Sequence, residues 1–223
     1  MKLIAILGSP RGMAGNTGML LSGFLQGASD AGADIDTFLL ADLDVQPCRG
    51  CEACHMTGAC PITDDFAVIH AAMAQADGFV LASPNYIHSV SAQMKALLDR
   101  CSGSIHLQAF TGKYAAALVT SGSADEDEVG RYLQRALRMT GCQTVGSVTA
   151  LGWQMANPSL REPALADAAA LGRSLVAAIS TRQQFSAQDE ERAMIREHMR
   201  QLVIMQKDHW PYEYTHWTSH PSV

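Results

Sequence analysis

The stretch KLIAILGSPRGMAGNT, residues 2–17, decides the fold of this chain. An almost wholly apolar segment of strand length is followed by a loop of glycines, small hydroxyls and one arginine, and then by a helical pattern. A buried strand that leads through such a loop into a helix is typical of the first unit of a parallel α/β sheet.

The same order of strand, loop and helix is repeated four more times along the chain. The later strand segments read DIDTFLL, GFVLAS, YAAALVT and TVGSVTAL, and a helical pattern follows each. Five such units predict an α/β fold with a doubly wound five-stranded parallel sheet in the order 2-1-3-4-5. Side chains that cap helices predict three starts: Asp64, Ser91, and a capping box of Ser123 with Glu126.

The alternation stops near Arg182, which predicts one domain over residues 1–182 and an added segment over 183–223. Ser186 with Asp189 opens an extra helix in this segment, and its apolar stripe is formed by Ile195, Met199 and Leu202. The aromatic end, HWPYEYTHWTSHPSV, is predicted to be irregular. We expect this segment to hold a homodimer or homotetramer together, and the alternative is that it folds back on its own subunit.

Composition limits the classes of partner and compartment. The chain has 223 residues and a net charge of −6 with scattered acidic groups, so we expect neither nucleic acid nor an anionic membrane surface as a partner. We find no cleavage site and no apolar run that approaches the ~20 residues of a membrane span. A cytoplasmic protein with a small-molecule partner is therefore expected.

The loop GSPRGMAGNT, residues 8–17, is predicted to bind phosphate. Backbone amides at a helix start attract anions, and Ser9, Asn16 and Thr17 would add side-chain donors, with Arg11 as the charged partner. Neither Gly-Lys-Ser/Thr nor GxGxxG is present, so a single terminal phosphate suits the loop best. The alternative is an ordinary turn with Asn16 as the helix N-cap.

Two further loops are expected at the same edge of the sheet. SPNYIHSVSAQMKALLDR, residues 83–100, follows the third strand at the point where the strand order reverses. Pro84 would stiffen the turn, while Asn85, Tyr86 and the backbone to His88 would face a flat heterocycle. The third loop, TSGSAD, would contribute Thr120, Ser121 and Gly122.

Together these motifs resemble the flavodoxin-like NAD(P)H-dependent FMN reductase superfamily over roughly residues 1–180. The resemblance implies that FMN phosphate lies on Ser9, Arg11, Asn16 and Thr17, and that the isoalloxazine ring lies against Pro84, Asn85, Tyr86 and Ile87. It also implies NAD(P)H as a possible substrate. His88 would lie on the flavin edge, where it either donates a proton or caps a loop.

Four of the six cysteines lie in one segment, the cysteine loop of residues 44–63. Cys48, Cys51, Cys54 and Cys60 fit C-x2-C-x2-C-x5-C, and four close thiolates are the ligand set of a [4Fe–4S] cluster. Zinc and unliganded thiols are the alternatives. We expect His55 to be exposed and not a ligand. Cys101 and Cys142 stand alone in the sequence, which predicts small buried hydrophobes.

The cysteine motif resembles that of the iron–sulfur flavoproteins of anaerobic microbes, a branch of the same superfamily. The resemblance implies an oxidoreductase that passes electrons between a [4Fe–4S] cluster and FMN, with ferredoxin or NAD(P)H as donor and a small molecule as acceptor. Two alternatives remain: an NAD(P)H-dependent FMN or quinone reductase without a cluster, and a non-enzymatic electron carrier.

Overall fold

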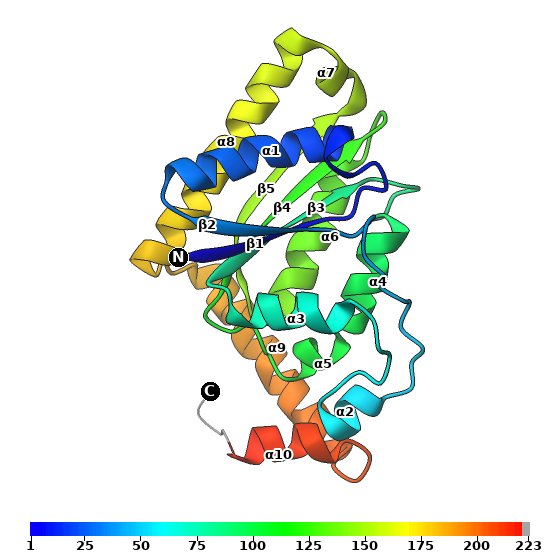
Figure 1. Cartoon of the computed structure of the whole chain (residues 1–223). Coiled ribbons are helices and arrows are strands. Elements are labelled where there is room, and N and C mark those ends of the chain that lie inside the picture. The colour runs from blue at the N-terminus through cyan, green and yellow to red at the C-terminus, as the bar shows by residue number, and fades with distance from the viewer. Residues whose placement is uncertain (220–223) are drawn as a thin grey trace.

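The computed structural model describes residues 1–219, so residues 220–223 of the predicted C-terminal segment lie outside the described residues. Its sheet has five parallel strands in the order β2-β1-β3-β4-β5, which confirms the predicted topology (Figure 1). The strands are β1 (Lys2–Leu7), β2 (Asp34–Leu39), β3 (Gly78–Pro84), β4 (Tyr114–Ser121) and β5 (Gln143–Leu151).

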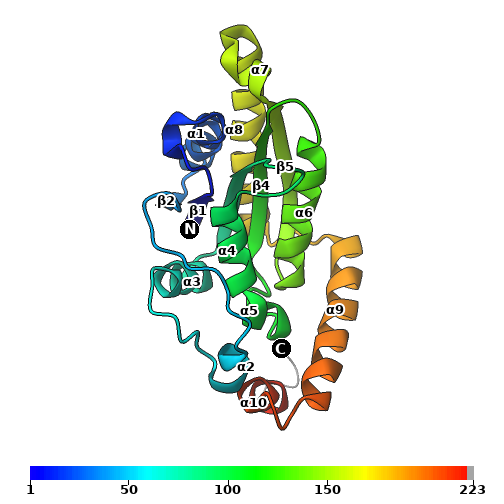
Figure 2. The ribbon, with the colours of Figure 1, turned by 90° about the vertical axis from the view of Figure 1, so that its right-hand side faces the viewer.

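Helices cover both faces of this sheet (Figure 2). The helical elements of the described chain are the 3-10 turn η1 (Gly12–Ala14), α1 (Asn16–Asp30), α2 (Ala53–Thr57), α3 (Phe66–Gln75), α4 (Ala92–Arg100), α5 (Ser102–His106), α6 (Glu126–Met139), α7 (Gly152–Ala156), α8 (Pro158–Thr181), α9 (Ser186–Met205) and α10 (Pro211–Ser219). The cores follow the two-residue period of the strands. In β1, Ile4 and Ile6 join the core under α3, α4 and α6, whereas Leu3, Ala5 and Leu7 join the core under α1 and α8.

Helices α1 and α8 touch backbone to backbone. A Cβ atom on Gly27 of α1 would lie 2.0 Å from the carbonyl oxygen of Ala169, and one on Gly172 of α8 would lie 2.4 Å from that of Phe24. Only glycine fits where two backbones approach so closely. The pair therefore forms one rigid layer, and α1 carries the phosphate loop at its start.

Helix α8 is long and apolar enough to cross a membrane by length and composition alone, so the expectation that no segment reaches this length is wrong. In the fold, Leu171, Leu175 and Val176 of this helix belong to the core shared with α1 and the sheet. Its apolar character is thus partly accounted for by packing within the domain.

The predicted helix starts are partly correct. Ser91 caps α4, because its hydroxyl accepts the backbone N–H of Met94 at 3.2 Å. The capping box of Ser123 with Glu126 is wrong: α6 follows Asp125, which has a φ of 63° and makes no side-chain cap bond. Asp64 lies one residue before the N-cap position of α3, which Asp65 occupies.

The C-terminal segment folds against its own subunit, which was the alternative to an intersubunit contact. Met199 and Val203 of α9 and Trp217 of α10 form a small buried cluster that also contacts Ile105 of α5. The expected irregular aromatic end is wrong over residues 211–219, which form α10. Helix α10 lies beside α2 of the cysteine loop, at the end of the molecule remote from α7 (Figure 1).

Candidate functional site

The predicted cofactor loops meet at the carboxyl edge of the sheet. Strand β1 ends at Leu7, and residues 8–15 follow it. Pro84 at the end of β3 pairs with Thr120 of β4, so the loops after these strands begin side by side. Parallel α/β sheets bind ligands at this edge, where the strand order reverses.

The phosphate loop has the geometry of an anion cradle. Ser9 is buried, and its hydroxyl accepts the backbone N–H of Arg11 at 3.3 Å, while Gly12 turns the loop with a φ of 53°. Helix α1 begins at Asn16 with Gly15 as N-cap, so Asn16 is not the cap. The amides of its first turn have no acceptor within the helix and remain available to an anion.

Thr17 links this loop to the end of β4. Its buried hydroxyl shares a 2.6 Å hydrogen bond with the hydroxyl of Thr120. The Asn16 amide lies close to Gly152 of α7, where a Cβ would be 3.4 Å from it. No local sequence pattern predicts this approach of the β5 end to the loop.

The loop after β3 presents groups that suit a flat ring. Asn85 Nδ2 donates to Ser121 Oγ at 3.2 Å, while its buried Oδ1 has no hydrogen-bond partner in the part of the chain that the structure describes. Ile87 is 95% exposed, and Ile87 and His88 both have positive φ, at 51° and 57°. Such strain concentrates at binding sites, and together with the unpaired oxygen it fits the predicted flavin edge. Tyr86 is also exposed there.

His88 and Gly122 lie at the rim of this edge. His88 Nδ1 is 3.1 Å from Asp125 Oδ2, and both side chains are exposed. Gly122 is exposed, and a Cβ there would meet nothing within 4 Å. The rim is thus open to solvent.

The cysteine loop leaves the end of β2 and runs away from the flavin edge. Cys48 and Cys51 are exposed, whereas Cys54 and Cys60 are half-buried and line a cavity of about 490 Å³. All four thiols are free, and the backbone N–H of Gly50 points to Cys48 Sγ at 3.5 Å. Four soft sulfur ligands on one short loop, with a backbone donor at the Cys48 sulfur, fit a [4Fe–4S] cluster.

Arg100, the last residue of α4, is hydrogen-bonded to residues at both ends of this loop. It donates to Asp64 through both terminal nitrogens, at 2.8 and 3.1 Å, and to the carbonyl of Gln46 at 2.9 Å. The guanidinium also interacts electrostatically with Cys60. Burial alone would raise the pKa of Asp64, but hydrogen bonds from Arg100 and two backbone amides outweigh it and hold that pKa below its usual value.

His55 is buried, so the expected exposed position is wrong. Its Nδ1 is hydrogen-bonded to Glu213 Oε1 of α10 at 2.6 Å, and its ring interacts electrostatically with the neighbouring Cys54 side chain. These two partners raise its pKa to about 10, the Cys54 contact having the larger effect. By contrast, Cys101 and Cys142 are buried as predicted, and burial raises the pKa of each to about 12.

Helix α4 connects the two predicted sites. Near its start, the Ser91 hydroxyl donates to the carbonyl of Gly8 at 2.5 Å, and its end at Arg100 holds the cysteine loop (Figure 1). Nine residues of α-helix span about 14 Å. The sequence suggested the flavin half of this motif but not the role of its final arginine.

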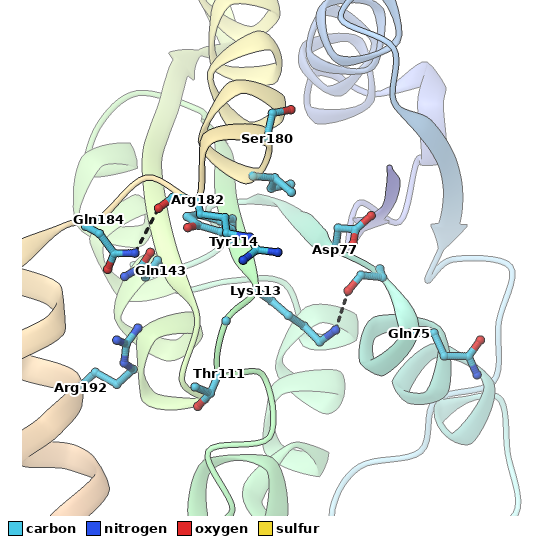
Figure 3. Close-up of a pocket in the computed structure, with 13 residues that line it drawn as sticks. Gln75, Asp77, Thr111, Lys113, Tyr114, Gln143, Ser180, Arg182, Gln184 and Arg192 are labelled. Atoms are coloured by element: carbon cyan, nitrogen blue, oxygen red, sulfur yellow. Dashed lines mark hydrogen bonds between the residues drawn. The ribbon is translucent and has the colours of Figure 1, made fainter. Parts of the chain in front are cut away.

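A cavity of about 760 Å³ lies at the opposite edge of the sheet, where it is lined by Lys113, Tyr114, Gln143 and Arg182 (Figure 3). None of the predicted site residues lines this cavity. Lys113 is already engaged, because its ammonium donates to the carbonyl of Ala76 at 2.6 Å. The candidate site is therefore the carboxyl edge together with the cysteine loop.

Comparisons with known proteins agree with this geometry. The family model of NADPH-dependent FMN reductase matches residues 1–154. An iron–sulfur flavoprotein of Archaeoglobus fulgidus is 30% identical over 192 residues, covering 86% of this chain and 86% of its own. Another, of Methanosarcina thermophila, is 32% identical over 165 residues, covering 71% of this chain and 84% of its own.

Among solved structures, the NAD(P)H:quinone oxidoreductase of Methanothermobacter marburgensis shares the fold, with a TM-score of 0.64 and 21% identity over 78% of this chain and 96% of that one. The flavodoxin-like topology and the family match agree. The chain belongs to the NADPH-dependent FMN reductase family, in its iron–sulfur flavoprotein branch, and is a flavin-dependent oxidoreductase.

Proposed function

We propose that this oxidoreductase transfers electrons between FMN at the carboxyl edge of the sheet and a [4Fe–4S] cluster on Cys48, Cys51, Cys54 and Cys60. The cysteine loop carries the proposal: it places four free thiols on one short segment whose ends are fastened by Arg100. The relatives named iron–sulfur flavoproteins support it.

Bound FMN would supply hydride and electron chemistry, and a bound cluster would supply single-electron transfer. The chain's own residues would bind and orient these groups. Ser9, Arg11, Asn16 and Thr17 would hold the phosphate, and the 84–88 loop would face the ring. Thr120, Ser121 and Gly122 would close the same edge from β4.

The proposal includes ferredoxin or NAD(P)H as donor, a small-molecule acceptor and a cytoplasmic location. It also includes a homodimer or homotetramer. Within one chain, α4 separates the flavin loop from the cysteine loop by its full length. This arrangement favours an assembly in which the cysteine loop of one subunit approaches the FMN of another.

Anaerobic analysis of iron and acid-labile sulfide tests the cluster. About four of each per chain are expected, together with about one FMN. Mixing the protein with reduced ferredoxin or with NADPH, and following flavin bleaching, then identifies the donor. A protein purified anaerobically with FMN but without iron and sulfide would contradict the proposal.

A second candidate is an NAD(P)H-dependent FMN or quinone reductase without a cluster. Cys48 and Cys51 are exposed and do not line the cavity beside Cys54 and Cys60, which favours this candidate. Rapid bleaching by NADPH with no bleaching by ferredoxin would support it. Tight FMN binding without turnover on any acceptor would instead indicate an electron carrier.

A further inference from the structure

The C-terminal helix α10 places a buried carboxylate beside the cysteine loop. Glu213 is 0% exposed, and its two oxygens are hydrogen-bonded to two different histidines: Oε1 to His55 Nδ1 at 2.6 Å and Oε2 to His106 Nδ1 at 2.9 Å. A buried carboxylate is stable only when it is paired in this way. Because His55 and Glu213 are 158 residues apart, the contact fixes the tail to the loop.

The rings around this carboxylate form a compact stack. His55 and His106 are stacked with centroids 4.5 Å apart, and Trp210 lies 4.9 Å from each ring. The Trp210 indole N–H donates to Glu52 Oε2 at 3.1 Å. The C-terminal segment therefore contacts His55, the residue after Cys54, and Glu52, two residues before it.

A second contact is made at the C-terminal end of α2. Gly58 has a φ of 82°, and a Cβ there would lie 2.4 Å from the ring of Tyr212, so this ring packs directly on the glycine backbone. Tyr212 and His216 also line the 490 Å³ cavity that contains Cys54 and Cys60. Helix α10 thus forms one wall of the space beside two of the four thiols.

The loop needs such support from outside. Between β2 and α2 it contains no helix or strand, and its anchors are contacts with other parts of the chain. Arg100 binds residues at its two ends, but none of its hydrogen bonds, to Gln46, Ile62 and Asp64, reaches the segment around Cys54. A segment with few internal hydrogen bonds opens readily unless side chains from elsewhere restrain it.

We propose that Glu213 is a positioning residue for the iron–sulfur site: through His55 it fixes Cys54, and α10 thereby keeps the loop in the conformation that binds the cluster. This inference rests on the proposed cluster. Glu213 acts through His55 and contacts no thiol in the hydrogen bonds of the described residues. A buried polar network in which every group is hydrogen-bonded specifies one side-chain geometry more strictly than apolar packing does.

The test compares Glu213→Gln with the parent protein and with Glu197→Gln as the matched control. Glu197 is exposed on α9, where it pairs with Arg200, away from the loop. Each protein is purified anaerobically and analysed for iron, sulfide and FMN. Visible circular dichroism of the cluster, and the rate at which a strong Fe(II) chelator removes iron, report the ligand geometry.

We expect Glu213→Gln to lose iron to the chelator about tenfold faster or more, since both histidine hydrogen bonds lose the carboxylate charge and one acceptor oxygen is replaced by an amide donor. Its visible dichroism should change while its FMN content stays at the parent value. Trp210→Phe keeps the ring packing but removes the hydrogen bond to Glu52, so we expect a smaller increase in the rate of iron release. If Glu213→Gln does not fold, this second variant provides the test. The control should behave as the parent.

The outcomes separate the two proposals. A parent protein with cluster and equal release rates in the parent, Glu213→Gln and Trp210→Phe would overturn the positioning role alone. A parent without iron and sulfide would overturn the proposed function and this inference with it. Zinc or sulfide-free iron in the parent, lost in Glu213→Gln, would also overturn the inference, because the two histidines and Glu213 would then be a separate metal site.

Discussion

The buried ion pair of Arg100 with Asp64 makes the stability of the domain depend on one carboxylate. The exposed fraction of the side chain is 1% for Arg100 and 0% for Asp64. Asp64 accepts two bonds from the guanidinium, at 2.8 and 3.1 Å, and the backbone N–H of Gln46 at 2.8 Å. Replacement by asparagine keeps the shape but leaves the guanidinium buried without its counter-charge.

We expect Asp64→Asn to lower the free energy of unfolding by about 3–5 kcal/mol, the usual cost of breaking a buried pair from one side. The total free energy of unfolding of a domain is about 5–15 kcal/mol, so this loss would be a large part of it. Because the folded pKa of Asp64 is lowered, its contribution is complete at pH 7 and is lost only as the pH falls below about 4 and through the folded pKa.

Urea unfolding of the FMN-free protein at pH 7, followed by tryptophan fluorescence, measures this change without a contribution from ligand binding. The control is Asp99→Asn, which removes an i,i+4 pair with Lys95 on the exposed face of the same helix. The control should cost less than about 1 kcal/mol. A change of under about 1 kcal/mol in Asp64→Asn as well would refute the argument that the buried pair holds the loop.

Three further predictions concern the two sites and the pH dependence. Replacing Asn16 and Thr17 together with alanine should weaken FMN binding about 100-fold or more, measured by flavin titration, and an unchanged Kd would place the phosphate elsewhere. Cys51→Ser should abolish the iron–sulfur absorption near roughly 400 nm while FMN stays bound, whereas loss of both would make the cysteine loop part of the flavin pocket. Burial lowers the pKa of His70, so protonation favours the unfolded chain and stability should fall as the pH drops below about 6.5. His70→Gln should reduce that fall, by at most about 1.4 kcal/mol per pH unit in urea unfolding, and an unchanged pH slope would contradict the assignment.

Features encoded by neighbouring residues could be predicted from the sequence. Five apolar segments with helices between them predicted the strand order, and Ser91 was correctly predicted to cap α4. The residues of the phosphate and flavin loops do meet at one edge of the sheet, because parallel strands end there together. Each of these predictions depends on a local pattern or on a general rule of the fold.

Contacts between distant segments could not be predicted in this way. No local pattern pairs His55 with Glu213, so the histidine was expected to be exposed. The tail residues 211–219 were expected to be irregular because their aromatic residues show no helical stripe, but packing against α2 and α9 stabilises a helix. The left-handed conformation of Asp125, which starts α6 without a capping box, depends equally on tertiary context.

The backbone contact between α1 and α8 would make the proposed flavin site sensitive to residues that lie outside it. Gly27 lies 11 residues after Asn16, which corresponds to about 16 Å along α1. An alanine there would need space that the carbonyl of Ala169 already occupies, so the helices would have to separate. Since α1 begins at the phosphate loop, a shift of this helix at Gly27 would also displace the loop at its other end. Loss of flavin in a variant of this chain can therefore originate in a methyl group placed on the opposite side of the domain.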